Sequence, residues 1–315
     1  MRVAEIKDKV VAPGTREDPA PGLGQALIRV QAAGVNGADP VQVAGFYPPP
    51  PEAGVAADIP GMELAGEVVE SRAPVPRFEP GARVMAIVAG AAQAELAVID
   101  ERQLMPVPDL LDWTQAGGFP EVFATAYDAL VGQANLRSGQ RLLINGAGGG
   151  VGTAAVQLGH VLGADVTASV RTEKNRAAVE ELGADRALAP DEAFAHGPFD
   201  VILELVGGPN LVENVKALAP WGTIVVIGVS AGFEGTLDLR RLMTKRGTVR
   251  ASTLRYRTPE EKAILARELE ASVLPLVADG RLRVPIEAEF PLDEVGAAYQ
   301  RFTAGGHLGK IVIRP

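Results

Sequence analysis

The sequence predicts an α/β protein of two domains, one of them built on a doubly wound parallel sheet. A short apolar segment at 141–144 and a helical pattern at 151–162 flank a glycine-rich turn, as in the first βα unit of such a sheet. From about residue 110, helical and strand patterns alternate. The first hundred residues carry mainly strand patterns, which indicates a second, β-rich domain.

The glycine-rich turn spans 147–152 and reads AGGGVG, a relaxed form of the G-x-G-x-x-G fingerprint. A turn with so few side chains lets backbone N–H groups approach a pyrophosphate at the positive end of a helix. Gly149 would permit that approach, and Gly152 would let the helix pack closely on the strand. A second strand pattern at 165–170 follows at the expected distance. We therefore expect a dinucleotide site here; the alternative is a glycine-rich connection that binds nothing.

The end of the second strand indicates which dinucleotide is bound. An NAD site usually has an acidic residue about 20 residues after the glycines, where it binds the ribose 2′-OH. This chain has Ser169 and Arg171 at that point, followed by Lys174 and Arg176. These residues would form a cationic pocket for the 2′-phosphate of NADPH, which is the expected cofactor. The alternative is that Arg171 and Lys174 are solvated charges at a helix start, where Glu173 dilutes the cluster.

The composition excludes several classes of protein. The chain has 315 residues, enough for two domains, and a formal net charge of −9, which argues against nucleic acid as the main partner. No apolar run approaches the roughly 18 residues of a membrane span, and the N-terminus starts like a strand and not like a signal peptide, so we expect a cytoplasmic protein. The sequence has no cysteine, which excludes disulfides, iron–sulfur clusters and cysteine-based zinc sites. The histidines His160, His196 and His307 are too scattered for a metal motif, and no metal is expected.

The β-rich part contains strand patterns at 25–35, 61–70 and 83–88. The first two of these enclose the segment 46–60, which holds four consecutive prolines. We expect this segment to be an irregular loop, either a plain connection or part of a pocket rim.

The alternating part begins with a helical pattern at 113–131, interrupted at 117–120. The segments 199–206 and 223–228 are continuous apolar strands of the kind buried in a parallel sheet. A stripe of apolar residues at helical spacing predicts one amphipathic helix over 260–279. We expect the last elements to complete the first domain. The remaining predicted elements are a short helix at 239–246, strands at 248–253 and 284–290, a helix at 293–303 and a closing strand at 310–313.

Several short motifs, in their order and spacing, resemble the zinc-independent quinone oxidoreductases of the medium-chain dehydrogenase/reductase superfamily over nearly the whole chain. They are GVNGAD at 34–39 with GFY at 45–47, PGME at 60–63, the turn at 147–152 and GKIV at 309–312. The segment RGTVRASTLR at 246–255, with TPEEK at 258–262, is most similar to the branch that includes the p53-inducible quinone oxidoreductase. The resemblance implies a GroES-like β-barrel catalytic domain formed by 1–114 and 256–315, and a Rossmann NADP-binding domain at 115–255.

The resemblance also implies a zinc-independent reaction. Zinc-dependent relatives carry Gly-His-Glu where this chain has GME at 61–63, so a thioether replaces an imidazole ligand and no Lewis acid polarises an alcohol. The expected enzyme is an NADPH:quinone reductase or enone reductase, which transfers hydride to a quinone or an α,β-unsaturated carbonyl. Two alternatives stay open: an enoyl reductase acting on a bulky acyl thioester or polyketide intermediate, and a non-catalytic NADPH-binding redox sensor or structural protein. Val41 and Val43 stand where quinone-selective relatives often have tyrosine and arginine, which favours an apolar substrate.

By the same resemblance, Asn36, Asp39 and Tyr47 lie beside the nicotinamide as the catalytic residues. Tyr47 would donate a hydrogen bond or a proton to the developing enolate or hydroquinone oxygen. The alternative for Tyr47 is a rim residue that only shapes the pocket. For Asn36 and Asp39 the alternative is local hydrogen bonding in the turn after a strand.

The resemblance implies a larger set of residues around the cofactor. Glu204 is expected to be structural, because an acid beside a phosphate would repel it. Relatives commonly pair through an edge strand of the nucleotide domain, here 248–253, so a homodimer is expected. The predicted cofactor-binding residues are Thr125, Gly149, Gly150, Val151, Gly152, Ser169, Arg171, Lys174, Gly228, Val229, Ser252, Thr253, Leu254 and Lys310.

Overall fold

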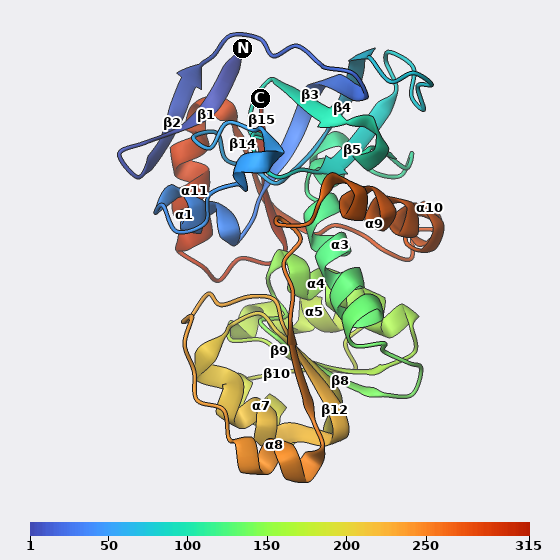
Figure 1. The fold of residues 1–315 in the computed structure, drawn as a ribbon. Helices are drawn as coiled ribbons and strands as arrows, with labels where there is room; N and C mark the ends of the chain where they lie inside the picture. The colour runs from blue at the N-terminus through green and yellow to red at the C-terminus, as the bar shows by residue number, and fades with distance from the viewer. The chain divides into compact units, whose positions relative to one another are not determined.

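A computed structural model describes residues 1–315, and the chain divides into two compact units. Unit 1 comprises Met1–Ala124, Leu254–Gly305 and Lys310–Pro315, and unit 2 comprises Thr125–Thr253 and Gly306–Gly309 (Figure 1). The first division lies ten residues beyond the boundary at 114 that the sequence suggested. The reason is that helix α2 (Trp113–Gly117) packs on strands β3 (Gln25–Val35) and β4 (Glu63–Ser71) of unit 1.

Unit 1 is built on a mostly antiparallel sheet of seven strands in the order β14-β15-β3-β4-β5-β7, with β6 also paired to β3. The expected strand at 25–35 is confirmed over its whole length as β3. Register shifts between Val30 and Ala32 bend β3 against β4, as β-bulges do. The other strands are β5 (Arg83–Ile87), β6 (Leu96–Asp100), β7 (Met105–Pro106), β14 (Ile286–Pro291) and β15 (Lys310–Arg314), and a separate hairpin joins β1 (Arg2–Lys7) to β2 (Val10–Thr15).

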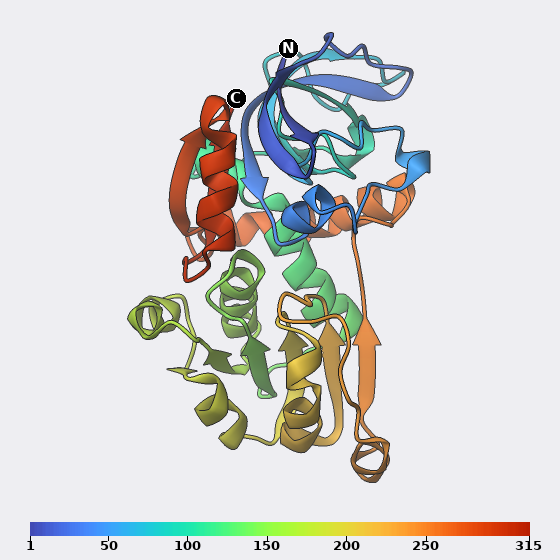
Figure 2. The same cartoon turned by 90° about the vertical axis from the view of Figure 1, so that its left-hand side faces the viewer.

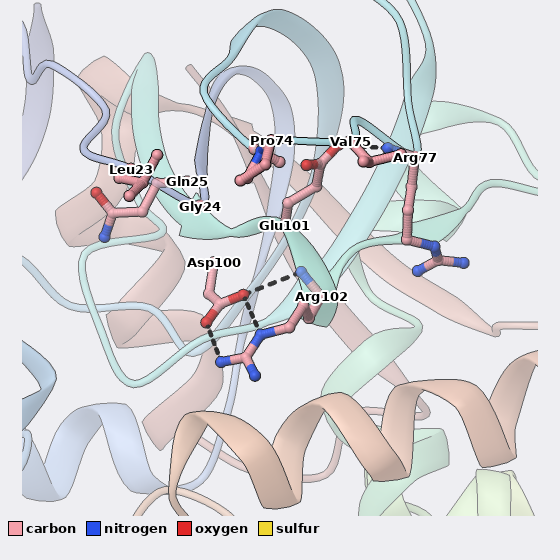
Figure 3. Close-up of a pocket in the computed structure, with 10 residues that line it drawn as sticks. Leu23, Gly24, Gln25, Pro74, Val75, Arg77, Asp100, Glu101 and Arg102 are labelled. Atoms are coloured by element: carbon pink, nitrogen blue, oxygen red, sulfur yellow. Dashed lines mark hydrogen bonds and ion pairs between the residues drawn. The ribbon is translucent and has the colours of Figure 1, made fainter.

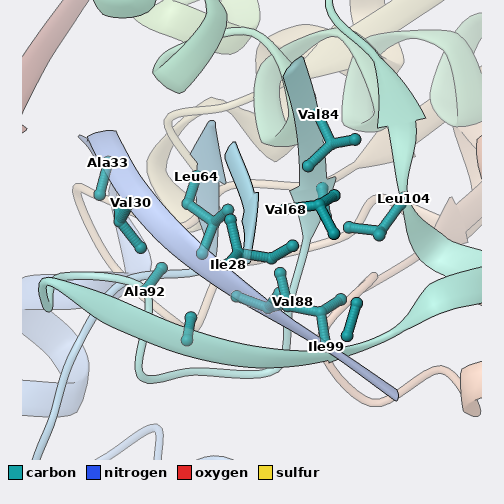
Figure 4. Close-up of a cluster of buried hydrophobic side chains, with 13 residues drawn as sticks. Ile28, Val30, Ala33, Leu64, Val68, Val84, Val88, Ala92, Ile99 and Leu104 are labelled. Atoms are coloured by element: carbon teal, nitrogen blue, oxygen red, sulfur yellow. The ribbon is translucent and has the colours of Figure 1, made fainter. Parts of the chain in front are cut away.

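The core of unit 1 is formed by side chains that alternate along these strands. Figure 4 shows Ile28, Leu64 and Val84 from three strands converging with Leu104, which lies just before β7, and all four are fully buried. Truncating one such side chain to alanine typically costs about 2–5 kcal/mol of stability. A second cluster places helix α11 (Val295–Thr303) against β2, β14 and β15, so the C-terminal segment completes this unit.

The expectation of one continuous helix over 260–279 is wrong. The structure has α9 (Pro259–Ser272) and a short α10 (Leu274–Ala278), with a break at Val273. Pro275 accounts for the break, because it has no N–H and its ring would clash with the carbonyl of Ala271 in an uninterrupted helix. The start of α9 is fixed by a capping box, in which Thr258 and Glu261 each accept the other's backbone N–H.

The helical pattern predicted at 113–131 is confirmed together with its interruption. Helix α2 ends at Gly117, and α3 (Pro120–Tyr127) starts after a short gap and continues as a π-helical turn over Asp128–Gln133.

No helix of the protein combines the length and the apolar character that a membrane span requires.

Unit 2 confirms the predicted doubly wound parallel sheet. Its six strands lie in the order β10-β9-β8-β11-β12-β13, and every neighbouring pair is parallel. The chain moves outward from β8 in one direction and then from β11 in the other, so the winding reverses between these two strands. The strands are β8 (Arg141–Asn145), β9 (Asp165–Ser169), β10 (Arg186–Leu188), β11 (Phe199–Glu204), β12 (Leu218–Val226) and β13 (Thr248–Ala251).

Helices link the strands of unit 2, as parallel connections require. The interiors of β8 and β11 are fully buried and apolar, which explains why they read as continuous apolar runs in the sequence. The helices are α4 (Gly150–Val161), α5 (Arg176–Glu181), α6 (Pro190–Ala195), α7 (Leu211–Ala217) and α8 (Leu239–Lys245).

Candidate functional site

The glycine-rich turn joins β8 to α4 at the point where the winding of the sheet reverses. Gly146 turns the chain with a φ of 80°, and Gly149 is the N-cap of α4. A Cβ atom on Gly152 would lie 2.5 Å from the carbonyl oxygen of Gly146 and 2.6 Å from the Cα of Ala147. Position 152 therefore requires glycine for helix and turn to approach this closely, which is the packing role expected of Gly152.

The first turn of α4 leaves backbone donors unused. The N–H groups of Gly150, Val151 and Gly152 have no acceptor within the protein, whereas the N–H of Thr153 bonds to the carbonyl oxygen of Gly149 over 2.8 Å. No side chain caps the helix, and a Cβ on Gly149 would have its nearest neighbour 3.8 Å away. Backbone N–H groups without a partner at the start of a helix suit an anion, and the turn fits a dinucleotide pyrophosphate.

The segment Gly306–Gly309 lies against the same turn. Gly309 donates its N–H to the carbonyl oxygen of Gly148 over 2.9 Å and forms a parallel bridge with Gly149. Asn175 donates a side-chain N–H to the carbonyl oxygen of Gly306 over 3.3 Å. Residues distant in the sequence thus border the glycine turn within unit 2.

The predicted cationic pocket follows β9. Ser169 is buried at the strand end, while Arg171 and Lys174 are exposed and form no ion pair or hydrogen bond with other residues of the protein. Arg176 donates its Nε–H to the carbonyl oxygen of Val170 over 3.3 Å. Arg171 and Lys174 are therefore available cations, and their contact with a 2′-phosphate stays a prediction.

Glu204 has the structural role expected of it. Its carboxylate is fully buried at the end of β11 and accepts N–H groups from the backbone of Val206 and Gly207, at 2.6 and 2.7 Å. It also accepts side-chain N–H groups of Asn145 and Asn214, at 2.8 and 2.7 Å. These bonds hold the loop after β11 to the end of β8, next to the glycine turn.

The remaining residues predicted around the cofactor are spread over several elements. A Cβ on Gly228 would lie 2.5 Å from the carbonyl oxygen of Leu205, so this glycine permits close packing after β12. Val229 beside it is 37% exposed.

The Ser252 hydroxyl donates to Asp128 over 3.1 Å, which ties the residue after β13 to the π-helical turn. Thr125 is buried in α3, Thr253 is the last residue before the division, and Leu254 and Lys310 belong to unit 1. Their cofactor contacts stay predictions.

In unit 1, Asn36 forms a buried triangle with Glu63 and Lys310. Asn36 donates its amide N–H to Glu63 Oε1 over 2.8 Å and accepts the Lys310 ammonium on Oδ1 over 2.6 Å. Lys310 Nζ also lies 2.6 Å from Glu63 Oε1 and 3.0 Å from the carbonyl oxygen of Val35. The ammonium therefore has three acceptors inside unit 1, and its predicted contact with the cofactor stays a prediction.

Asp39 lies beside this triangle, in the first turn of helix α1 (Ala38–Val43), and is fully buried. It accepts the backbone N–H of Asn36 over 2.7 Å and that of Gly61 over 3.2 Å. Burial raises the pKa of Asp39 to about 6, against the opposing effect of these N–H groups and of the charges on Lys310 and Arg255. The bond to Asn36 is the local turn bond that the sequence offered as an alternative role.

Tyr47 is half-buried and is held by Arg255. The Arg255 guanidinium donates to the carbonyl oxygen of Tyr47 over 2.7 Å, and its carbon lies 5.1 Å from the centre of the Tyr47 ring. The ring of Tyr256 meets that of Tyr47 edge to face, with centres 5.4 Å apart and planes at 84°. No role for Arg255 was predicted, although it is the last residue of the segment RGTVRASTLR at 246–255 that carries part of the family resemblance.

Glu121 is a second residue that sequence reasoning missed. Its backbone N–H, at the start of α3, donates to Glu63 Oε2 over 2.8 Å. Burial, followed by the charge of Glu63, raises the pKa of Glu121 to about 8, although Lys310 and Lys262 act in the opposite direction. Only the three-dimensional arrangement brings these groups together, because they come from four separate segments of the chain.

Lys262 adds a third cation to this region. Its ammonium donates to the carbonyl oxygen of Arg255 over 3.1 Å, and burial lowers its pKa.

Met62 is buried, and no group of three or more His, Asp or Glu side chains has a geometry suited to a metal ion.

A pocket of about 560 Å³ on unit 1 contains none of the predicted site residues. Figure 3 shows it lined by the exposed apolar side chains Leu23 and Val75 and by the ion pair between Asp100 and Arg102. Its carboxylates already have partners, because Asp100 pairs with Arg102 and Glu101 accepts the backbone N–H of Arg77 and the Ser71 hydroxyl, and we assign the pocket no part in the chemistry.

The comparisons with known proteins agree with both units. The family model described as alcohol dehydrogenase GroES-like domain matches residues 22–132, and the one described as zinc-binding dehydrogenase matches residues 150–271. The GroES-like domain expected from the sequence is confirmed by the first match. The quinone oxidoreductase-like protein 2 homolog of Nematostella vectensis is 31% identical over 305 residues, which cover 93% of this chain and 82% of that protein.

Two further matches widen the comparison. The spectinabilin polyketide synthase system protein NorB of Streptomyces orinoci is 34% identical over 321 residues, which cover 98% of this chain but 14% of that much longer protein. The crystal structure of an alcohol dehydrogenase superfamily protein from Novosphingobium aromaticivorans superposes with a TM-score of 0.86 at 29% identity, over all of both chains.

Proposed function

Because the chain belongs to the quinone oxidoreductase-like group of the medium-chain dehydrogenase/reductase family of oxidoreductases, we propose that it is an NADPH-dependent reductase of quinones or α,β-unsaturated carbonyls. The observation that carries this proposal is the start of α4, where three backbone N–H groups have no acceptor within the protein. These donors would hold the pyrophosphate, and Arg171 with Lys174 would hold the 2′-phosphate that distinguishes NADPH from NADH.

When bound, the cofactor supplies a hydride, and the protein supplies orientation and a proton donor. Tyr47 is the proposed donor, because its phenol can bond to the oxygen that gains negative charge during reduction. Asn36 and Asp39 support this proposal indirectly: both are buried and hydrogen-bonded, so they fix the chain between β3 and α1 that leads to Tyr47.

The reaction is proposed to need no zinc. At the position where zinc-dependent relatives have histidine, this chain has buried Met62, and the carboxylate of the next residue, Glu63, is occupied by Lys310. We expect the purified protein to contain less than stoichiometric zinc by elemental analysis and to keep its activity in a chelator. Stoichiometric zinc, lost together with activity on chelation, would contradict this part of the proposal.

The activity is tested by mixing the protein and NADPH with 1,4-benzoquinone or a 2-enal and following the loss of NADPH absorbance. Acceptor-dependent oxidation of NADPH, much faster than that of NADH, is expected. Tight binding of NADPH in calorimetry without turnover of a broad acceptor panel would instead favour a redox sensor or structural role. Absence of binding by either reduced coenzyme would overturn the proposal.

A second candidate function is enoyl reduction of a bulky acyl thioester. It is favoured by the match to a polyketide synthase along almost the whole of this chain, and by aliphatic Val41 and Val43 in α1. Product analysis with unsaturated acyl thioesters separates the two functions: saturated thioester, formed faster than hydroquinone or saturated aldehyde, would select the enoyl reductase.

We also propose a homodimer formed through the edge of the unit 2 sheet. Strand β13, drawn in orange, lies at the edge of the sheet (Figure 2) and pairs only with β12, so its other edge has free backbone groups. Its four residues are exposed. The exposed side chains of Val249 on this strand and Met243 on α8 would add apolar area to such a contact. Light scattering should give twice the 32.9 kDa mass of the chain; a monomer at micromolar concentration would refute it.

A further inference from the structure

We propose that Arg255 is a positioning residue that acts through Tyr47, an inference that rests on the proposed function of Tyr47 as the donor to the reduced substrate. Arg255 is 2% exposed and does not itself face solvent. Its guanidinium instead contacts both the backbone and the ring of Tyr47, and it is anchored by two further acceptors. It would hold this phenol at the place where the reaction needs it.

The guanidinium makes three hydrogen bonds with three separate segments of unit 1. Nε donates to the carbonyl oxygen of Ala89 over 2.7 Å, Nη1 to that of Tyr47 over 2.7 Å, and Nη2 to Gln42 Oε1 over 2.6 Å. The same group stacks on the Tyr47 ring. Arg255 thus contacts Tyr47 at two points, through the main chain and through the ring face.

We call these contacts of Arg255 the Arg255 clamp. Gln42 extends the clamp to the other end of the proline-rich loop at 46–60. Its side-chain N–H donates to the carbonyl oxygen of Ala57 over 2.9 Å, while its Oε1 accepts from Arg255. Arg255 holds the loop at Tyr47, and Gln42 holds it ten residues later at Ala57. The two side chains therefore close the base of the loop that carries Tyr47.

The chemistry of the clamp explains why an arginine is buried here. All three hydrogen-bond acceptors are carbonyl oxygens, and none is a carboxylate, although Asp39 and Glu121 lie near enough to favour the charged form. Burying a cation without a hydrogen-bonded counter-ion is costly, and only the planar fork of arginine reaches three acceptors in fixed directions while stacking on a ring. Lysine at this position would keep the charge but not this geometry.

The first test is a double-mutant cycle in kcat/KM with Arg255→Lys and Tyr47→Phe. If Arg255 acts by positioning Tyr47, R255K should lower kcat/KM about 10- to 100-fold in the presence of Tyr47. In the Y47F background the same substitution should change kcat/KM by less than about 2-fold, because the group that it positions is gone. An equal loss in both backgrounds would overturn the proposal.

Gln42→Met provides a second variant in case R255K does not fold. It keeps Arg255 and removes only the bridge to Ala57, so a smaller loss in the same direction is expected, again confined to the background that has Tyr47. Arg102→Lys, at a half-exposed arginine paired with Asp100, serves as the matched control and should leave kcat/KM unchanged.

A measurement without turnover separates this proposal from the proposed function. The chain has four tyrosines, so 3-fluorotyrosine labelling gives four ¹⁹F signals, and Y47F assigns that of Tyr47. R255K and Q42M should shift or broaden the Tyr47 signal and leave that of Tyr127 in unit 2 unchanged. An unaltered Tyr47 signal would overturn the positioning role. If the wild-type protein reduces no acceptor, the proposed function fails, and the ¹⁹F spectra still decide whether Arg255 positions Tyr47.

Discussion

The backbone N–H of Glu121 donates to Glu63 Oε2 over 2.8 Å, so the start of α3 is fastened to the carboxylate that also pairs with Lys310. The charge of Glu63 acts on the carboxyl group of Glu121, which is partly buried. Burial, followed by repulsion from Glu63, favours the protonated form of Glu121, and its pKa is raised to about 8.

The raised pKa predicts a particular dependence of stability on pH. The folded protein keeps a proton on Glu121 up to about pH 8, whereas the unfolded chain releases it near the ordinary value of 4.5. Between these values the folded state binds more protons, so the contribution of Glu121 to the free energy of unfolding falls as the pH rises. In the variant Glu121→Gln, the free energy of unfolding should therefore fall less between pH 5 and pH 9 than it does in the wild type. Urea unfolding at a series of pH values measures this.

Glu268→Gln is the matched control for this experiment, because Glu268 is exposed on α9 of the same unit. Its stability should follow that of the wild type across the pH range. Parallel curves for the wild type and E121Q would show that Glu121 is ionised in the folded protein at neutral pH, contrary to the prediction.

The two exposed cations after β9 should determine the preference for NADPH. Replacing both Arg171 and Lys174 by alanine would remove the two proposed charge-assisted bonds to the 2′-phosphate, each of about 1.5–3 kcal/mol. The Kd of NADPH should therefore rise about 100-fold or more, while that of NADH, which lacks this phosphate, should stay the same. Calorimetry with both coenzymes measures this. Arg240→Ala, at another exposed arginine of unit 2, controls for net charge; equal weakening of both coenzymes would contradict the prediction.

Two glycines of the turn should respond differently to alanine. A methyl group at Gly152 would clash with the carbonyl oxygen of Gly146, so Gly152→Ala should lower stability by about 1–3 kcal/mol. Gly149 has ordinary extended dihedrals and open space, so Gly149→Ala should fold normally and weaken only the binding of the dinucleotide. Thermal unfolding and coenzyme titration on both variants test this contrast. It fails if G149A is as unstable as G152A.

Removing the Tyr47 hydroxyl should slow the reaction without changing the fold. A proton donor in the transition state typically contributes about 10²- to 10⁴-fold to the rate, so Tyr47→Phe should lower kcat by about that factor and leave the Kd of NADPH unchanged. Tyr256→Phe keeps the neighbouring ring and serves as the control. Wild-type kcat in Y47F would assign Tyr47 to shaping the pocket.

The strongest sequence predictions concerned features encoded by consecutive residues. The apolar run of β8, the glycines before α4 and the apolar face of α4 lie within one segment, so their pattern predicts a strand, a turn and a helix directly. The break at Val273 was not predicted, because the apolar stripe continues across Pro275 and its spacing alone indicates one continuous helix.

The sequence by itself determined the class of the fold and the glycine turn, because the apolar pattern of β8, the glycines and the pattern of α4 lie within one segment. The alternation of strands and helices along the chain also predicts a parallel sheet. Only the tertiary structure decided the environment of Tyr47 and of the buried charges. Arg255 reaches Tyr47 and Gln42 across more than 200 positions, and Lys310 reaches Asn36 across 274. Such contacts arise when separate strands and helices pack together, and no local periodicity records which distant side chains will share one buried site.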